Sequence, residues 1–231
     1  MYFRHTPQLW QQFPELVAGT LFVPHVAAQA NVEQYLDPFF QRARTRIQTG
    51  TEADMPEIAA WRRAFAKMGL KPTQYRSAAE ALLRRFRKED DLPRLHPLVD
   101  LCNAVSLTYA LPIAVFDIAR VASFIEVCHA TGTESYLAFS GETEHPDPQE
   151  VIFVDAQQQV HARRWTFRQS RQSTVSHTTA QVLIVCEGLH ATANDDVRAM
   201  LADLVKTIAA VWKTDVQQSM LTATQPQFDF A

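Results

Sequence analysis

The strongest constraint on the fold is a change of hydrophobic pattern near the middle of the chain. Up to about residue 109, apolar residues recur at helical spacing, in segments 31–47, 54–67, 77–89 and 97–109. After residue 112, short apolar runs bounded by turn residues indicate strands. Helices mainly in the first half and strands mainly in the second favour an α+β fold, with helices packed on a mixed or antiparallel sheet.

The expected strands and the last helix complete this outline. An early strand is expected at 19–23, and later strands at 113–118, 123–128, 151–154, 161–167 and 182–186. A long helix begins at Asn194 and carries one apolar stripe up to Trp212. We therefore expect a single domain over residues 1–214, followed by a loose polar tail over 215–231.

Cysteine usage and hydropathy exclude several protein classes. Cys102, Cys128 and Cys186 are far apart, so no zinc ribbon is expected, and no set of residues has metal-ligand spacing. The Gly-rich phosphate loops and the GxSxG elbow are absent, and we predict no cofactor and no metal. The chain shows no export signal and no apolar run of membrane-spanning length, so a cytoplasmic protein without membrane contact is expected.

The charge pattern allows only a local contact with nucleic acid. The net charge is −3, whereas proteins that wrap nucleic acid are usually basic. Residues 156–180 form a basic stretch, which contains four arginines and no Asp or Glu. This stretch is the candidate site for a phosphate or another anion.

Within that stretch, basic and aromatic residues alternate. If the segment 161–170 is a strand, Arg164 and Arg168 lie on one face, and Arg163 and Trp165 on the other. Guanidinium groups bind phosphate and aromatic rings stack on bases, which suits a nucleic-acid end or an anionic ligand. The alternative is an edge strand with solvated arginines and a tryptophan in the core.

A second candidate segment is the helix expected at 97–109. Asp100, Asn103 and Ser106 lie along one side of it, and could line a pocket or form hydrogen bonds to a neighbouring loop. The alternative is that Asp100 and Asn103 only support the fold. Asp117, at the end of a predicted strand, is most simply a turn or helix cap.

Several blocks of the chain resemble one family. Leu98-Val99-Asp100-Leu101-Cys102-Asn103, followed by Leu111-Pro112-Ile113-Ala114-Val115-Phe116-Asp117, is similar to the signature of the B3/B4 domain of the bacterial phenylalanyl-tRNA synthetase β subunit. Gly132-Thr133-Glu134 matches a turn of that family. Stand-alone B3/B4 proteins share Tyr75-Arg76-Ser77-Ala78-Ala79-Glu80-Ala81-Leu82, Arg163-Arg164-Trp165, Arg168-Gln169-Ser170 and Thr174. The resemblance covers about residues 60–190.

The resemblance implies a function. In the synthetase this domain hydrolyses the ester that joins a wrong amino acid to its tRNA. A stand-alone relative would bind aminoacyl-tRNA 3′ ends, and the enzymatic hypothesis is a deacylase that clears mischarged esters. The expected roles are tRNA or substrate binding by Arg163, Arg164, Trp165 and Arg168, and catalysis by Asn103, Ser106, Glu134 and Thr174.

Departures from the family leave an alternative open. The synthetase lines its editing pocket with glycines where this chain has Ala162-Arg163-Arg164-Trp165, and it has histidine where this chain has Ala114. The wrong amino acid that the synthetase domain removes is chiefly tyrosine, and this specificity does not carry over. The alternative function is a protein that binds, or an enzyme that acts on, a small amino-acid-like metabolite in the same pocket.

Overall fold

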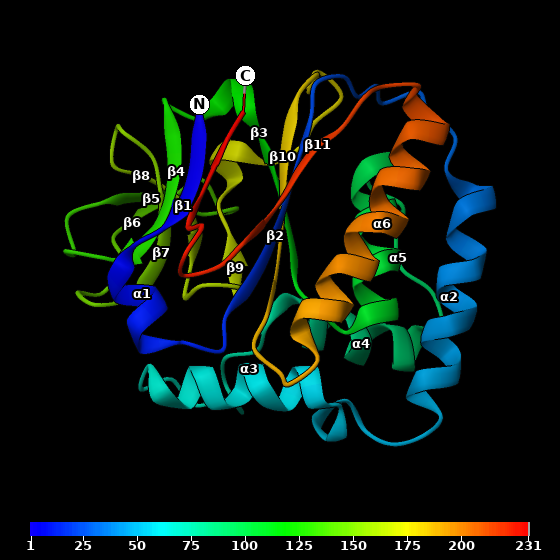
Figure 1. The fold of residues 1–231 in the computed structure, drawn as a ribbon, viewed down its shortest axis with the longest axis horizontal. Helices are drawn as coiled ribbons and strands as arrows, with labels where there is room; N and C mark the ends of the chain where they lie inside the picture. Colours follow the sequence, from blue (N-terminus) through cyan, green and yellow to red (C-terminus); the bar gives the residue numbers. More distant parts are fainter. Residues whose placement is uncertain (231) are drawn as a thin grey trace.

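The computed structural model describes residues 1–230 and contains α helices, short 3-10 helices and strands in two sheets (Figure 1). The α helices are α1 (Pro7–Gln12), α2 (Glu33–Ile47), α3 (Pro56–Lys67), α4 (Ala78–Glu89), α5 (Pro97–Tyr109) and α6 (Ala193–Trp212). The 3-10 helices are η1 (Glu52–Asp54), η2 (Ile118–Arg120) and η3 (Arg171–Ser173).

The strands occur in both halves of the chain, with most of them after residue 112. They are β1 (Tyr2–His5), β2 (Val17–Val23), β3 (Ile113–Asp117), β4 (Phe124–His129), β5 (Ser135–Leu137), β6 (Thr143–Glu144), β7 (Val151–Val154), β8 (Gln159–Arg163), β9 (Arg168–Gln169), β10 (Val182–Gly188), β11 (Gln217–Leu221) and β12 (Gln227–Asp229). The expected α+β class is confirmed, but the strands divide between two sheets.

The two sheets differ in their pairing. The eight-stranded sheet has the order β12-β1-β4-β7-β8-β5-β6, with β9 paired to β8. It is mixed, because β1 with β4 and β5 with β8 are parallel pairs. The four-stranded sheet has the order β11-β2-β10-β3 and is antiparallel throughout.

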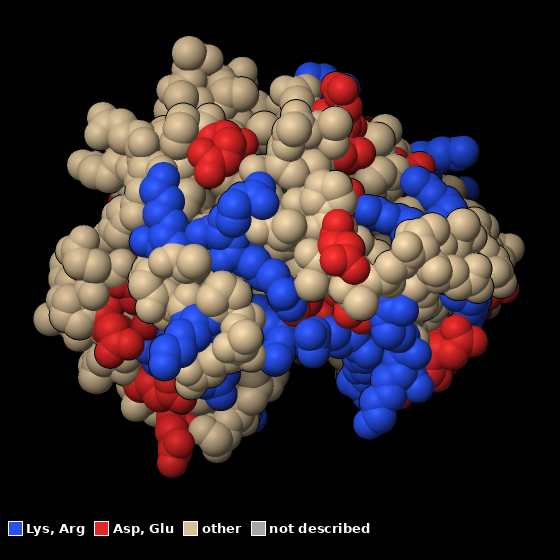
Figure 2. All heavy atoms as spheres, turned by 90° about the horizontal axis from the view of Figure 1, so that it is seen from below, with Lys and Arg blue, Asp and Glu red and all other residues tan. Residues whose placement is uncertain are grey.

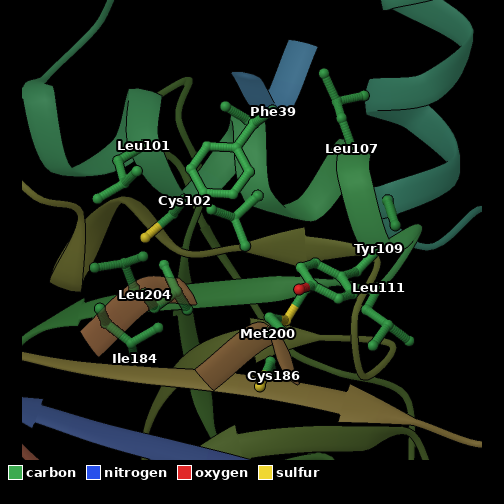
Figure 3. Close-up of a cluster of buried hydrophobic side chains, with 14 of the residues drawn as sticks. Phe39, Leu101, Cys102, Leu107, Tyr109, Leu111, Ile184, Cys186, Met200 and Leu204 are labelled. Atoms are coloured by element: carbon green, nitrogen blue, oxygen red, sulfur yellow. The ribbon is translucent and has the colours of Figure 1, made fainter. Parts of the chain in front are cut away.

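The four-stranded sheet is the middle layer of the molecule. On one face it packs against α5 and α6, with α2 against α5, and the eight-stranded sheet lies on the other side (Figure 1). Because side chains alternate along a strand, Ile184 and Cys186 of β10 enter the core on the helical side, whereas Leu183 and Val185 enter the core between the sheets. Figure 3 shows the helical-side core, where Phe39 and Leu101 lie above Ile184. By the same alternation, Glu187 belongs to the side between the sheets.

Local signals explain why the helices begin and end where they do. The Ser77 hydroxyl accepts a hydrogen bond from the Glu80 backbone N–H at 3.3 Å, as the predicted cap requires. Pro97 occupies the first turn of α5, where its missing N–H costs nothing. Gly69 follows the end of α3 with φ of +77°, a conformation that favours glycine. Asp117 caps η2 through the Ala119 N–H, and the turn or cap predicted for it is confirmed.

Two expectations are wrong, one about the strand at 161–167 and one about the C-terminal tail. The strand expected over 161–167 ends at Arg163, because Arg164 and Trp165 have φ of +48° and +58° and turn the chain back into β9. The tail after Thr214 is not loose: β11 pairs with β2 and β12 pairs with β1. Unpaired edges of both sheets supply the backbone partners for this polar segment, which its own pattern does not reveal.

Among the helices of residues 1–230, none is both long enough and apolar enough to cross a bilayer.

Candidate functional site

A small cavity lies between the two sheets, beside the turn that follows β8. Its volume is about 60 Å³. The walls come from β3, β7, β8, β9 and β10, from the turn 165–167 and from the first residue of α4; they include Ala78, Pro112, Ile113, Ala114, Trp165, Arg168 and Glu187. One water needs roughly 10–15 Å³ by this kind of measure. The cavity therefore has room for a small side chain or an amino-acid-sized group, but not for a nucleotide.

Hydrogen bonds hold the cavity walls together. The side-chain amide of Gln169 donates to the Val115 carbonyl at 2.7 Å and ties β9 to β3. The Ala78 N–H donates to the Thr166 carbonyl at 2.8 Å and ties α4 to the turn after β8. Both links cross between elements that line the cavity, so its shape is built into the fold.

Glu187 is the acidic residue in the cavity wall. Its Oε1 lies 2.6 Å from His5 Nε2 and accepts a hydrogen bond from Trp165 Nε1 at 2.9 Å. Oε2 has no hydrogen-bond partner among residues 1–230. A carboxylate that lines a cavity and keeps one oxygen free can accept a hydrogen bond from a ligand, and an ammonium group is the donor that its charge favours.

Trp165 holds this carboxylate from within an aromatic cluster. The ring is fully buried and makes edge contacts with Phe13 and Trp61, at centroid distances of 4.8 and 5.0 Å. Trp165 lies in the cavity wall, as expected for a residue that lines the pocket. It is also buried in the core, as the alternative expected. Stacking on a nucleic-acid base is not open to Trp165, because no part of its ring is exposed to solvent.

Arg163 forms ion pairs with two glutamates inside the protein. Its guanidinium donates two hydrogen bonds of 2.8 Å to Glu150 and one of 2.6 Å to Glu144, and only 5% of its side chain is exposed. The paired carboxylates raise the pKa of Arg163, and they do so more strongly than its burial lowers it. In this arrangement Arg163 joins β8 to β6 and to the residue before β7, and three of its five N–H groups are engaged by carboxylates.

Arg164 and Arg168 differ from Arg163 in their access to solvent. Arg164 lies over the Tyr75 ring at 4.9 Å and within 3.8 Å of Glu150. Arg168 belongs to the cavity wall, has 44% of its side chain exposed and approaches Glu144 at 3.7 Å. The exposed guanidinium of Arg168 is thus the one among the three that can reach an anion at the cavity mouth.

The four residues predicted to be catalytic do not lie in the cavity wall. The Ser106 hydroxyl donates to the Leu111 carbonyl at 2.6 Å, and the Thr174 hydroxyl donates to the Ser170 carbonyl at 3.0 Å. Glu134 accepts hydrogen bonds from the N–H groups of Thr131 and Gly132 and stabilises its own turn. Asn103 is half-buried on α5. Their catalytic role stays a prediction, while these contacts are structural.

A family model decides the classification. The model for the B3/4 domain matches residues 60–202, which is more than half of the chain. This chain belongs to the B3/4 domain family. No curated protein matches it.

One solved structure similar to this B3/4 protein is an N-terminal fragment of the phenylalanyl-tRNA synthetase beta-subunit from Pyrococcus horikoshii. The sequences are 14% identical and the TM-score is 0.41. The similarity covers 52% of this chain and 41% of that chain, so it spans less than half of the fragment's own length.

A basic face formed by α3 and α4 was missed by the sequence analysis of this B3/4 protein. Residues 62–88 contain nine Lys or Arg residues and one acidic residue, Glu80, a net charge of +8. A running charge count would have found this segment, which is more basic than residues 156–180. Figure 2 looks onto this side of the molecule and shows many Lys and Arg side chains gathered there. Several remain exposed, among them Arg63, Lys71 and Lys88.

Sequence analysis also missed a buried Ser-His-Asp arrangement. His161 Nδ1 lies 2.9 Å from the Ser173 hydroxyl, and His161 Nε2 lies 3.3 Å from Asp155. Nucleophilic catalysis uses this order of groups, but the nucleophile must reach a substrate. Ser173 is fully buried and does not line the cavity between the sheets, so the three residues support the fold.

Asp155 in this group gives the protein a predictable acid sensitivity. Burial alone would raise the pKa of Asp155, but the His161 ring 3.3 Å away and hydrogen bonds from the N–H groups of Ala122, Gln157 and Gln159 hold that pKa below its ordinary value. A carboxyl group whose pKa is lower in the folded than in the unfolded state stabilises the fold at pH values above its unfolded pKa of about 3.9. This stabilisation is lost as the pH falls through the folded-state pKa.

We therefore expect Asp155→Asn to lower the free energy of unfolding at pH 7, and this deficit to shrink as pH falls below about 4. Urea unfolding of both proteins at a series of pH values measures the deficit. The exposed Asp37→Asn serves as control, with no comparable deficit. A deficit for Asp155→Asn that is constant from pH 7 to pH 3 would contradict the assignment.

Proposed function

We propose that this B3/4 protein binds the aminoacyl end of a charged tRNA, with the amino acid in the cavity between the sheets, and that it hydrolyses mischarged esters. The observation that carries the proposal is Glu187, whose free Oε2 can receive the α-ammonium group of an amino acid inside a cavity of that size. Membership of the B3/4 domain family supports it.

The charges around the cavity support a polyanionic partner. Arg168 lies in the cavity wall, and Ala78, the first residue of α4, lies beside it. From there the basic face of α3 and α4 extends over one side of the molecule (Figure 2). A small ligand would not need this face, whereas the phosphates that follow the aminoacyl group would contact it.

Hydrolysis of an aminoacyl ester requires few catalytic groups from the protein. An aminoacyl ester is already activated, so a held ester, a positioned water and the exclusion of bulk solvent can accelerate its hydrolysis. The cavity offers a buried, shaped wall and a carboxylate that fixes the amino group. Asn103, Ser106, Glu134 and Thr174 remain candidates for orienting the ester, although each lies outside the cavity wall.

The test is the loss of labelled amino acid from a panel of correctly and incorrectly charged tRNAs. We expect wild type to accelerate the loss from at least one mischarged species. Glu187→Gln removes the charge but keeps the hydrogen-bonding shape, and should slow that loss by roughly 10- to 100-fold, the worth of a charge-assisted hydrogen bond. Exposed Glu89→Gln is the matched control and should behave as wild type. No loss from any species, at protein near-stoichiometric with tRNA, would contradict the deacylase function.

A second expected result concerns the basic face. Arg63→Ala should weaken tRNA binding and make log K depend less steeply on log salt concentration, by close to one unit of slope per lost phosphate contact. Arg198→Ala, on α6 and outside residues 62–88, should leave the slope unchanged. Filter binding at several salt concentrations measures both. An equal slope for wild type and Arg63→Ala would favour the metabolite-binding alternative.

A further inference from the structure

Three side chains that can bind a metal meet at the end of β10, outside the cavity. Glu57 lies in the first turn of α3, His190 lies between β10 and α6, and Asp196 lies in the first turn of α6. One potential ligand atom from each of the three lies within 4.8 Å of the other two. The fold thus places one imidazole nitrogen and two carboxylates around a common point.

Two buried atoms of this cluster have no hydrogen-bond partner. Glu57 uses Oε1 to accept a 2.7 Å hydrogen bond from Arg46, while its buried Oε2 has none among residues 1–230. His190 Nε2 lies 2.8 Å from Asp196 Oδ2, while the buried Nδ1 has no partner within the same residues. The side chains of Glu57 and His190 are only 9% and 2% exposed. Buried polar atoms are usually paired, so two orphans in one cluster point to a ligand.

The charge and access of the cluster suit a cation. Two carboxylates face one guanidinium, that of Arg46, which leaves a net negative charge when His190 is neutral. Arg46 also donates to the Thr108 carbonyl, so it is held at the edge of the cluster. Asp196 keeps 34% of its side chain exposed, which gives an ion a path from solvent and leaves room for water as a further ligand.

We propose that Glu57, His190 and Asp196 bind one divalent transition-metal ion of the Zn²⁺ class. Imidazole nitrogen and carboxylate oxygen are ligands that Zn²⁺ takes at about 2.0–2.2 Å. Ligand atoms around such an ion lie about 3.4 Å apart in a tetrahedron. The three ligand atoms lie at most 4.8 Å apart, and His190 Nε2 lies 2.8 Å from Asp196 Oδ2, so shifts of little more than an ångström bring them to that spacing. The ion would join β10, α3 and α6 at one point.

This candidate metal site could not be recognised from the sequence, because its three residues do not have the short spacing of known metal motifs. Metal sites are recognised in a sequence by ligands a few positions apart, as in CxxC or HExxH. Here His190 and Asp196 come from the two sides of a strand-to-helix turn, and Glu57 is brought in from α3 by the packing of that helix near β10. The prediction that no metal binds rested on spacing alone, and this site would overturn it.

The experiment is a titration of the full chain, stripped of metal with a chelator, with Co²⁺ and then with Zn²⁺. We expect one equivalent of Co²⁺ to produce a saturable visible absorption that Zn²⁺ removes. Zn²⁺ at a hundredfold excess over its Kd should raise the Tm by roughly 5–10 °C. Glu57→Gln, which keeps an acceptor for Arg46, and Asp196→Asn should each weaken binding by at least about a hundredfold.

Asp195→Asn is the matched control, since Asp195 lies beside Asp196 in the first turn of α6 but outside the cluster. It should bind both ions as wild type does. If Glu57→Gln fails to fold, the more exposed Asp196→Asn decides the question. The proposal is overturned if wild type shows no saturable one-equivalent binding, or if Asp196→Asn binds as tightly as Asp195→Asn. Both outcomes leave the deacylation assay unaffected, so the two proposals fail separately.

Discussion

Replacing Arg163 by alanine is expected to lower the free energy of unfolding by about 3–5 kcal/mol. Arg163 holds Glu150 with two hydrogen bonds in a buried pair, and its side chain is 5% exposed. Removing the guanidinium leaves the Glu150 carboxylate buried without the two charge-assisted hydrogen bonds of its main cationic partner. Urea unfolding at pH 7 measures the loss.

Two comparisons make this test specific. Arg168→Ala removes an exposed arginine whose nearest carboxylate oxygen is 3.7 Å away, and should cost less than about 1 kcal/mol. The double variant Arg163→Ala/Glu150→Ala should be more stable than Arg163→Ala alone, because it removes the stranded charge. Equal losses for Arg163→Ala and Arg168→Ala would show that Arg163 is not a structural ion pair, and would restore it as a ligand contact.

The second large effect is expected from blocking the cavity. Ala114 lies on β3, in the cavity wall, with its methyl group on the side between the sheets. A leucine there would occupy much of the 60 Å³ and keep an aminoacyl group out. We expect Ala114→Leu to slow deacylation by roughly a hundredfold or more, because a substrate displaced by about 1 Å already loses that much.

Stability measurements separate blockage from misfolding. Overpacking costs about 1–3 kcal/mol, so Ala114→Leu should fold and lose only a few degrees of Tm. Ala119→Leu, an exposed position on η2, should keep both full activity and wild-type Tm. A folded Ala114→Leu protein with wild-type deacylation would place the site outside the cavity.

The helices were predictable because their ends carry local signals. Ser77 at the start of α4, Pro97 at the start of α5 and Gly69 after α3 each satisfy or avoid a backbone requirement within a few residues. The predicted helix 97–109 has the bounds that the structure shows for α5. The α+β class followed from these helices and from the strand-like runs after them.

The turn at residues 164 and 165 could not be predicted in this way. Positive φ usually falls on glycine or asparagine, and here it falls on an arginine and a tryptophan. Tertiary contacts compensate: the Arg164 N–H donates to Glu150, and the Trp165 N–H donates to the Val151 carbonyl. Because Glu150 and Val151 are distant in sequence from the turn, the pattern of residues 161–167 alone favoured a strand.

The candidate site was predicted only in part. Trp165 and Arg168 were chosen for their residue types and do line the cavity, whereas Arg163 was chosen for the same reason and is buried in ion pairs. Glu187 was missed, because the predicted strand 182–186 ends one residue before it. An acid that continues the two-residue alternation of a buried strand is a signal that could have found it.

The most direct test of an amino-acid site at Glu187 follows the Trp165 indole N–H by NMR, since this group donates to Glu187 Oε1 in the cavity wall. A replacement of each of the four tryptophans in turn assigns the indole signals. The ligand is an adenosine carrying an amino acid on its 3′ position through an amide, which the protein cannot hydrolyse as an ester. We predict a saturable shift of the Trp165 signal with the free-amine ligand and a much weaker one with its N-acetylated form. No shift with either, or equal shifts with both, would contradict an amino-acid site at Glu187.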